Sequence, residues 1–590
     1  MKRVRLLGLG LVTLAGISLA SCSNGGKMSI YGYNANGEVK ELAKGDLLFK
    51  ENSEIPYISL DDSISVMNRV RESVTGDKSC NVSLKKENND FVLYNSGAKC
   101  TINSTDQTFK FDDYDKFVSV STSLQNPLSI FTIKNGKKAI KQVSSTYEKG
   151  QELTIDLKPY SKLDIYEKDN KCYIPLSVYN TVLLNTGENV SLAYNGSNMF
   201  LVTGNSLSDR SMGMPFLTEL GTKFRENAKK DAISEDYANY YYQSLCFDFN
   251  TSYGLKSKFT NIDTFLTEKN YKTNLLSTNP KVLDTYTDIA LSYLNDGHTV
   301  LSESSICYEF GEALIDTTKK SQERSNWMTN GERFAENKKG TITAGLDYQQ
   351  GNDTVFVSFD EFSAFDEDLY YMGTMKEDQT ESIPGLEIPT ELIKSNIASN
   401  TALLFNKLYQ DLTSDAYKNS IHNIVIDLTS NDGGSSDSLV FALSTLIGNV
   451  EIDMINPLTG AHNHQVYKAD INADGKVDDN DRSLMDLGFK IYFLNSNYTF
   501  SSGNAMPVIA KANKPSIVTL GAKTGGGPCA VRTNVTPIGS LIESSSLSTI
   551  AKYDGTKYVD IDGGIEAQHQ LTEAQMIDRA YIRSNIGSWN

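Results

Sequence analysis

Residues 425–435 read Val-Ile-Asp-Leu-Thr-Ser-Asn-Asp-Gly-Gly-Ser. The apolar start predicts a buried strand, the glycines predict a turn, and helical spacing follows over 438–447. Two further units have a related form: a strand over 491–494 before a helix over 502–512, and a strand over 516–520 before a glycine-rich turn. Strands that alternate with helices predict a largely parallel sheet with helices packed on it, so the expected fold class is α/β. Sites in such sheets gather at the carboxyl ends of the strands, where these turns lie.

The rest of the chain divides by its sequence pattern. Residues 23–55 begin rich in Gly, Asn and Lys and are interpreted as a tether. Short alternating runs split by Asn, Gly, Asp and Ser predict a β-rich, stalk-like domain over 56–205. Apolar residues at helical spacing predict a helical subdomain over 207–300. Residues 301–590 then form the α/β core, with a strand at 354–359 and a helix at 390–412.

Residues 1–22 have the three parts of a secretory signal. A positive start precedes an apolar run over 6–19 that is too short to span a bilayer, and the segment ends in Leu-Ala-Ser-Cys. This ending resembles the bacterial lipobox, which implies that Cys22 is lipidated; an ordinary signal with a chance Cys is the alternative. We therefore expect the body in water in the bacterial cell envelope. The lipid would anchor it on the outer face of the cytoplasmic membrane or in the outer membrane.

Composition narrows the function classes. The 590 residues suffice for about two to four domains, and 39% hydrophobic with 22% charged residues indicates a globular chain. The net charge of -17 argues against nucleic acid as a partner, because an acidic surface repels phosphate backbones. With only 5 histidines, few candidates exist for a general base at neutral pH. Export permits disulfides among the remaining cysteines; Cys80 and Cys100 would form a local pair, and the connectivity stays open.

Three short phrases carry candidate chemistry. His298, in Asn-Asp-Gly-His-Thr, follows a helix end and can be exposed and oriented, although a helix stop with a surface His explains the phrase as well. Gly433 and Gly434 let backbone N–H groups point at a ligand, as in an oxyanion hole, although Asn-Asp-Gly-Gly is also ordinary turn chemistry. Ser501 opens a helix, whose N-terminus favours a developing negative charge, although a capping Ser has the same position.

Taken in order, the phrases resemble the tail-specific, or C-terminal processing, serine peptidase family. The matching phrases are Asp-Gly-His-Thr at 296–299, Asp-Leu with Asn-Asp-Gly-Gly at 427–434, Thr-Phe-Ser at 499–501, Gly-Ala-Lys-Thr-Gly-Gly-Gly at 521–527 and Gly-Ile-Glu at 564–566. The resemblance covers about 210–575. It implies a crotonase/ClpP-like core preceded by a helical subdomain, and a hydrolase that acts on polypeptides without a catalytic cofactor.

The family has two catalytic styles, and the residues here resemble only one. Gly527 stands where one style has a Lys, so that Ser–Lys dyad is missing. The other style, that of tricorn-like and retinoid-binding-protein-like relatives, uses the His of the Asp-Gly-His-Thr phrase. The resemblance therefore implies that His298 takes the proton from Ser501. Thr429 departs from the family, which usually has an Arg after Asp-Leu.

The same resemblance implies the supporting groups. The N–H groups of Gly433 or Gly434, together with that of Ser502, would hold the oxyanion. A carboxylate should orient His298 through its second ring nitrogen, and in tricorn-like relatives it comes from the C-terminal part. The candidates are Asp560, Asp562 and Glu566.

Residues 470–481 fit a twelve-residue calcium loop, with Gly at its sixth position. Oxygen ligands fall at the expected positions: Asp470, Asn472, Asp474, the carbonyl of Lys476, Asp478 and Asp481. The loop resembles a single dockerin loop, and an acidic solvated loop is the alternative. Because it lies between two core strands, we expect a structural Ca²⁺ rather than cohesin binding.

Two phrases in the β-rich region look alike: Pro-Tyr-Ile-Ser-Leu at 56–60 and Tyr-Ile-Pro-Leu-Ser at 173–177. They resemble the paired half-motifs of the copper amine oxidase N-terminal-like stalk domain, a cell-surface module, and imply no copper. An unrelated β-rich spacer is the alternative.

Three functions follow from the sequence. The first is an exported, lipid-anchored serine endopeptidase with a Ser nucleophile and a His base. The second is a catalytically inactive surface lipoprotein on the same fold that binds a peptide or another ligand. The third is a calcium-dependent interaction module.

Overall fold

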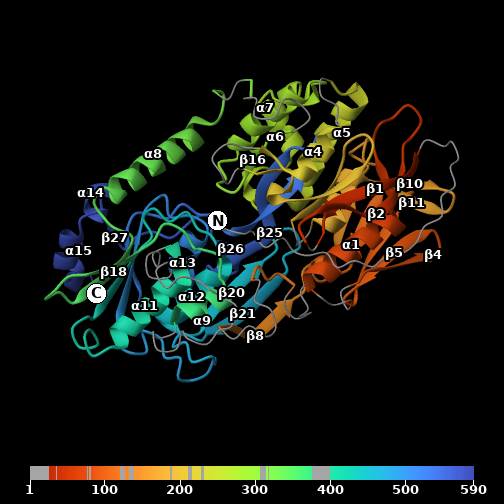
Figure 1. The fold of residues 1–590 in the computed structure, drawn as a ribbon. Helices are drawn as coiled ribbons and strands as arrows, with labels where there is room; N and C mark the ends of the chain where they lie inside the picture. The colour runs from red at the N-terminus through yellow and green to blue at the C-terminus, as the bar shows by residue number, and fades with distance from the viewer. Residues whose placement is uncertain are drawn as a thin grey trace.

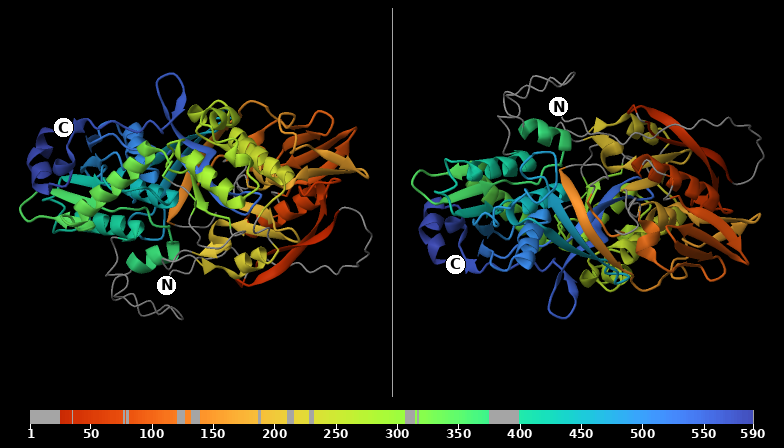
Figure 2. Two further views of the ribbon diagram at one scale, coloured as in Figure 1. Left: turned by 90° about the horizontal axis from the view of Figure 1, so that it is seen from above. Right: turned by 90° about the horizontal axis from the view of Figure 1, so that it is seen from below.

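The structure is a computed structural model that describes residues 25–34, 36–75, 78, 81–119, 127–131, 139–185, 189–209, 216–227, 232–305, 314–315, 318–374 and 399–589. The expected signal with Cys22 lies outside these residues. Figures 1 and 2 show an elongated molecule with the N-terminal strands at one end and the C-terminal core at the other. The predicted α/β fold with a β-rich N-terminal region is confirmed.

The central sheet of the core has the order β17-β18-β19-β22-β23-β27 within the described residues. Its strands are β17 (Gly345–Tyr348), β18 (Thr354–Ser358), β19 (Asn423–Asp427), β22 (Lys490–Asn495), β23 (Val518–Gly521) and β27 (His569–Gln570). From β18 to β27 the neighbours are parallel, with Phe356 opposite Val425 and Val425 opposite Tyr492. The parallel sheet predicted from the βα units is therefore confirmed.

Helices cover both faces of this sheet. On one face, Ile424 and Ile426 of β19 are buried in the same cluster as residues of α11 (Thr401–Thr413), α12 (Ser436–Ile447) and α13 (Ser502–Asn513). On the other, Val425 is buried in a cluster with residues of α15 (Arg579–Asn585). Burial on both faces explains why β19 is a continuous apolar run rather than an alternating one.

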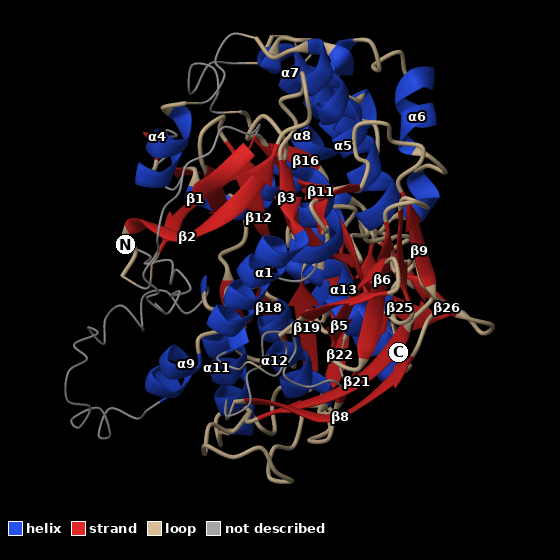
Figure 3. Cartoon of the chain, turned by 90° about the vertical axis from the view of Figure 1, so that its right-hand side faces the viewer, coloured by secondary structure: helices blue, strands red, loops and turns tan. Residues whose placement is uncertain are grey.

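A second sheet of the core recruits a strand from far upstream. Its members are β16 (Val300–Glu303), β25 (Leu541–Tyr553), β20 (Val450–Ile455), β21 (His462–Ala469) and β8 (Ile140–Glu148), with β24 (Cys529–Val535) and β26 (Tyr558–Asp560) also on β25. β8 pairs with β21 from end to end, and Figure 3 shows the two strands side by side. The predicted domain 56–205 is therefore wrong at 140–148, because pairing between distant strands leaves no local signal in the sequence.

The N-terminal sheet overturns the predicted tether. β1 (Gly25–Tyr33) and β2 (Val39–Leu48) form an antiparallel pair, so residues 25–48 belong to a folded domain. The other strands of this sheet are β3 (Tyr57–Ser59), β10 (Tyr166–Lys168), β11 (Lys171–Pro175), β12 (Val190–Tyr194) and β13 (Met199–Thr203). Residues 25–48 were interpreted as part of a tether because β1 and β2 have a polar composition. Ile30 and Leu47 are among the few side chains of this pair that are deeply buried.

The two look-alike phrases lie next to each other in this sheet. β3 pairs with β11, Ile58 opposite Ile174, and each strand runs into a helix, α1 (Leu60–Thr75) or α3 (Leu176–Tyr179). The two similar phrases are therefore partners in one antiparallel strand pair. A neighbouring sheet holds β4 (Ser83–Glu87), β5 (Asp90–Asn95), β6 (Ala98–Asn103), β7 (Thr108–Phe111) and β9 (Leu153–Asp156).

Four α-helices lie within the described part of 207–300, the range predicted as a helical subdomain, together with two short strands, β14 (Ser208–Asp209) and β15 (Phe216–Leu217). The helices are α4 (Glu219–Arg225), α5 (Glu235–Ser252), α6 (Ile262–Glu268) and α7 (Pro280–Ser292). A helix that the sequence did not reveal, α8 (Gln322–Lys339), then runs toward α14 (Glu573–Met576) at the far end of the core (Figure 1). It was missed because only Phe334 and Lys338 are buried on it, so it has no apolar stripe. Two shorter helices are α2 (Tyr114–Val118) and α9 (Glu367–Thr374).

Four cysteines lie within the described residues. Cys100, Cys172, Cys246 and Cys529 are buried free thiols, so the local pair considered for Cys100 is not formed; its suggested partner Cys80, like Cys307, lies outside the described residues. Burial raises the pKa of all four thiols, which keeps them protonated at neutral pH. Within the described ranges, no helix is both long and apolar enough to cross a bilayer.

Candidate active site

Ser501 lies after β22, where the chain turns into α13. Its backbone has φ 55° and ψ -126°, a conformation that L side chains rarely adopt and that costs about 1–3 kcal/mol. Ser501 occupies the capping position of α13, yet its side chain makes no capping hydrogen bond. A helix-capping role therefore does not account for this serine. Such strain clusters at active sites, where the surrounding structure enforces it.

Hydrogen bonds from two neighbouring turns hold this conformation. The Phe500 N–H donates to the carbonyl of Asn431, in the turn after β19, at 3.0 Å. The Ser501 N–H donates to the carbonyl of Gly526, in the turn after β23, at 2.9 Å. The carboxyl ends of three parallel strands thus meet around Ser501, as the sequence predicted.

Gly433 makes the closest approach to the serine. It has φ 113°, and a Cβ there would lie 2.5 Å from the Cβ of Ser501 and 2.9 Å from its Oγ. Gly434, at φ 122°, packs equally tightly against the backbone of Phe362. A side chain at Gly433 would displace Ser501, and one at Gly434 would clash with the Phe362 backbone. Close packing, in addition to the turn itself, therefore requires glycine at both positions.

Only part of the predicted oxyanion hole has free donors. The N–H of Gly433 donates to Oδ1 of Asn431 at 3.0 Å, so Gly433 is already engaged. The N–H groups of Gly434 and Ser502 have no acceptor among the residues that the structure describes. Ser502 Oγ donates to the carbonyl of Gly434 at 2.8 Å, which links the two segments that carry these donors.

Asp296 folds the loop that carries His298. One carboxylate oxygen of Asp296 accepts the His298 N–H at 3.0 Å. The other accepts the Thr299 hydroxyl at 2.6 Å and the Tyr253 hydroxyl at 3.0 Å. Sequence reasoning missed this role of Asp296, although an Asp two residues before a turn residue is the signal of an Asx-turn.

The His298 ring lies against the loop that carries Ser501. It packs edge-on against Phe500, the residue before Ser501, with 4.8 Å between ring centroids. Its Nδ1 is buried without a hydrogen-bond partner, and the described hydrogen bonds include none between His298 and Ser501. Burial lowers the pKa of His298, although the charges of Asp296 and Asp562 oppose the shift. The imidazole is therefore neutral at pH 7, the form that accepts a proton.

Phe500 fills the space that a Lys at position 527 would need. A Cβ on Gly527 would lie 2.6 Å from the Phe500 ring, and a Cβ on Gly297 would clash with the same ring. The ring also packs edge-on against Trp327 of α8 at 5.8 Å. The residue at 527 therefore supplies no Lys for a Ser–Lys dyad, and the basic side chains beside this loop include His298 and Arg324, which donates to the carbonyl of Gly297 at 3.1 Å.

Residues 393–571 match the family described as Peptidase family S41. The chain contains a peptidase family S41 domain. This places it among the serine-type peptidases, which are hydrolases with polypeptide substrates. The matched range includes Gly433, Gly434 and Ser501 but not His298. A search of curated proteins found no match.

Several solved structures resemble the chain at low identity. A lipoprotein from Streptococcus agalactiae is 14% identical with a TM-score of 0.32, over 60% of this chain and 97% of that one. The photosystem II D1 C-terminal processing protease is 19% identical with a TM-score of 0.25, over 32% of this chain and 44% of that one. The tricorn protease is 10% identical with a TM-score of 0.28, over 94% and 61%. The chain spans less than half of the processing protease. At these TM-scores the likenesses do not bear on the site, and nothing found supports the stalk-domain or dockerin resemblance.

Of the three candidate carboxylates, Asp560, Asp562 and Glu566, Asp562 is the one that lies near His298 and Gly527. Its charge acts on His298, and its Oδ1 accepts the N–H of Gly527 at 3.3 Å. Asp560 accepts the N–H of Asp562 at 3.0 Å and so supports it. Glu566 is 68% exposed and lies in an ion pair with a surface lysine. None of the three hydrogen-bonds the His298 ring among the bonds described.

A buried charge cluster underlies the glycine turn of the S41 domain. Asp427, at the end of β19, is fully buried and pairs with Lys338 of α8 at 3.3 Å and with Arg579 of α15. Burial would raise the pKa of Asp427, but the two cations and bonds from Thr429 hold it far below its ordinary value. Lys338 also donates to Ser430 Oγ at 2.8 Å. Positive charge beside Asp427 thus comes from two distant elements, α8 and α15, and not from position 429, which is a Thr.

The loop at 470–481 is folded around its two end carboxylates. Asp470 accepts the N–H groups of Asp474 and Gly475 at 3.1 and 2.7 Å, and Asp481 accepts those of Ile471 and Asp478 at 3.0 and 2.8 Å. Burial, and for each also a nearby carboxylate, raises the pKa of Asp470 and Asp481. Across the described ranges, no group of three or more His, Cys, Asp or Glu side chains is placed to hold a metal.

Proposed function

We propose that this chain is an exported, lipid-anchored serine endopeptidase with Ser501 as nucleophile and His298 as general base. The strained backbone of Ser501 carries the proposal: it is held between two turns, pressed against Gly433 and left without a capping bond. A capping or packing role would not require that strain. The neutral, buried His298 ring next to the same loop supports the assignment of the base.

The chemistry follows from these groups. Ser501 Oγ attacks a peptide carbonyl as His298 takes its proton, and the imidazolium then protonates the leaving amine as the C–N bond breaks. Water attacks the acyl ester in the second half with His298 again as base. The ring must shift to bond Ser501, as is common when a substrate completes a loose apo site.

Two backbone N–H groups, those of Gly434 and Ser502, hold the oxyanion in this proposal. Loss of one such donor typically costs about 2.7–4 kcal/mol of transition-state stabilisation. The carboxylates of Asp296 and Asp562 stabilise the imidazolium that forms on His298 through their charge. Asp562 is the orienting carboxylate that we propose among the three candidates, because it alone acts on His298.

A fluorophosphonate probe tests the nucleophile without knowledge of the substrate. We expect one adduct per chain, located at Ser501 by peptide mass spectrometry. Its rate should need neutral His298, so the rate should fall in acid with a midpoint below 6.5, because burial lowers the pKa of this His. The His298→Ala variant should lose the pH dependence together with most of the rate.

Other results of the labelling would contradict the proposal. An adduct at Ser502 alone would show that Ser502, and not Ser501, is the nucleophile. No adduct on a folded protein would favour the inactive ligand-binding lipoprotein on the same fold.

Export and anchoring through Cys22 rest on the sequence of residues 1–22, and the first described strand begins soon afterwards at Gly25. Lipid on Cys22 would therefore hold the folded body close to the membrane surface. The full chain, expressed in a bacterium, should partition into the detergent phase of Triton X-114. The Cys22→Ser variant should move to the aqueous phase, and equal partitioning of the two would refute the anchor.

We also propose a structural Ca²⁺ in the loop at 470–481. Its support is the pair of buried carboxylates Asp470 and Asp481, which have no ion pair in the described structure and each have a raised pKa. A divalent cation bound by these oxygens would offset their repulsion. Ca²⁺ should raise the melting temperature and EDTA should lower it, whereas Asp481→Ala should respond to neither. Equal melting of the wild type with Ca²⁺ and with EDTA would exclude the ion.

A further inference from the structure

Lys258 reaches the candidate active site from the helical subdomain. It ends a short 3-10 helix after α5, Lys256–Lys258, and its Nζ pairs with Oδ2 of Asp562 at 3.2 Å. Only 25% of the lysine side chain and 24% of the aspartate side chain are exposed. Because a partly buried ion pair is screened much less than a surface pair, the lysine charge changes the field that Asp562 exerts on its neighbours.

Asp562 lies against the turn that holds the strained serine. A Cβ on Gly526 would lie 3.0 Å from Asp562 Oδ1, and the carbonyl of Gly526 accepts the N–H of Ser501 at 2.9 Å. The charge of Asp562 also raises the pKa of His298 against the effect of burial. Lys258 therefore pairs with a carboxylate that is linked to both members of the proposed dyad.

The titratable and charged groups around the His298 loop come from several elements: Asp296 in the loop itself, Tyr253 after α5, Arg324 in α8 and Asp562 after β26. Burial lowers the pKa of His298 and Arg324 lowers it further, whereas Asp296 and Asp562 raise it. His298 Nδ1 is buried and makes no hydrogen bond within the described structure. Nearby charges, rather than a bond at Nδ1, therefore control how readily this ring takes up a proton.

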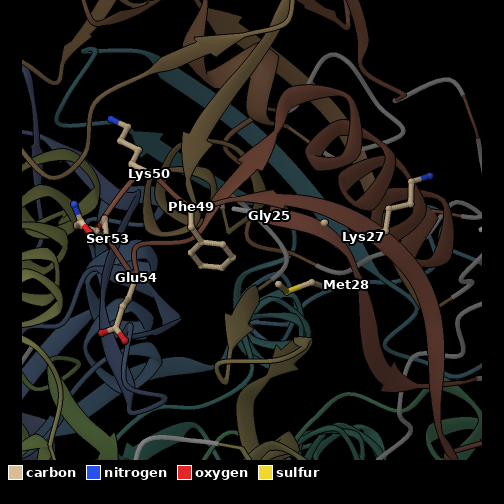
Figure 4. A pocket seen from close by; sticks show the side chains of 9 residues that line it. Gly25, Lys27, Met28, Phe49, Lys50, Ser53 and Glu54 are labelled. Carbon is tan, nitrogen blue, oxygen red and sulfur yellow. The ribbon is translucent and has the colours of Figure 1, made fainter. Parts of the chain in front are cut away.

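Two other lysine–carboxylate pairs differ from this one in their surroundings. Lys50 lines the hollow drawn in Figure 4 and pairs with Asp164, just before β10. Lys523 pairs with Glu566 at 3.3 Å, and these side chains are 49% and 68% exposed. Neither carboxylate is among the charges described as acting on His298. The pair with Lys523 is therefore suited as a control for the pair with Lys258.

We propose that Lys258 is a positioning residue for the peptidase reaction. It holds Asp562 against the Gly526 turn and offsets part of the negative charge that this carboxylate presents to His298. The inference rests on the proposed function, in which His298 is the general base. With Lys258 in place, the base stays neutral to a lower pH than Asp562 alone would allow. Removal of the lysine charge favours the protonated imidazole, which cannot accept the proton of Ser501.

The pH dependence of fluorophosphonate labelling of the full-length chain tests this role. Lys258→Gln removes the charge and keeps a hydrogen-bond donor, and it should raise the acid midpoint of the labelling rate by about 0.5–1 pH unit. Lys258→Arg keeps the charge and should retain the wild-type midpoint. Lys523→Gln, which removes an equal charge from the pair with Glu566, is the matched control and should leave the midpoint unchanged.

The Asp562→Asn variant shows whether Lys258 acts through this carboxylate. Asp562→Asn should lower the midpoint, because it removes a negative charge that favours the protonated form of His298. Addition of Lys258→Gln to this variant should change the midpoint little, because the group through which the lysine acts is absent. A merely structural role of Lys258 would lower the labelling rate at every pH and leave the midpoint in place.

A titration that does not depend on Ser501 keeps this inference separate from the proposed nucleophile. The His298 signal of ¹³C-histidine-labelled protein, assigned by its absence in His298→Ala, should titrate at a higher pH in Lys258→Gln than in the wild type. An unchanged His298 midpoint, an equal shift in Lys523→Gln or an equal shift in the Asp562→Asn background would overturn the inference. Failure to label Ser501 together with the expected NMR shift would reject the nucleophile and support the charge role of Lys258.

Discussion

The Ser501→Ala variant is expected to lose hydrolysis of a quenched fluorescent peptide library by about 10³- to 10⁶-fold in kcat/KM. Removal of Oγ removes the atom that forms the acyl ester, whereas the oxyanion donors and the binding surface remain. The same substitution should not lower stability, because Ser501 Oγ has no capping bond. Circular dichroism and thermal denaturation would check that the fold is retained.

Two further variants make this result specific. Ser502→Ala removes a hydroxyl that bonds the carbonyl of Gly434 in the same turn, and it should cost far less activity than Ser501→Ala. His298→Ala should cost about as much as Ser501→Ala, and the double variant should cost little more, because the two residues act as one unit. Full additivity of the two losses, or full activity of Ser501→Ala, would remove Ser501 from the mechanism.

The Asp427→Asn variant is expected to lower the free energy of unfolding by about 3–5 kcal/mol. The change leaves Lys338, which is 4% exposed, and Arg579 without their buried anionic partner. Because the folded pKa of Asp427 is depressed, its contribution is present above the unfolded value near pH 4 and is lost as the pH falls below it. Thermal denaturation at pH 7 should therefore separate the variant from the wild type more clearly than denaturation in strong acid.

The exposed ion pair between Arg333 and Glu573 provides a matched control on the same helix, α8. Its side chains are 52% and 46% exposed, so Glu573→Gln should change the unfolding free energy by no more than about 1 kcal/mol. An Asp427→Asn effect as small as that of Glu573→Gln would show that the buried cluster adds nothing to stability. Loss of activity in Asp427→Asn without loss of stability would instead assign the cluster to the positioning of the glycine turn.

The parallel core sheet, and the short phrases that meet at its edge, could be predicted from local sequence patterns. A continuous apolar run such as 425–428 can be recognised as a buried strand, because strands that are buried on both faces contain few polar side chains. The glycine turn and the helix that begins at Ser502 could be predicted from the sequence because turn and helix-start signals are local. The S41 domain of residues 393–571 follows from the same local phrases.

The way in which distant parts of the chain complete the site and the domains could not be predicted from local patterns. β8 joins the core sheet through pairing with β21, and residues 25–48 fold into a sheet, because strand partners are chosen by contacts that lie far away in the chain. Likewise, the two cations that pair with Asp427 belong to α8 and α15. No local sequence pattern predicts an ion-pair partner that lies on another element. The strain at Ser501 depends on bonds from two other turns, so a sequence that reads equally well as a helix cap becomes a candidate nucleophile only when the three strand ends meet.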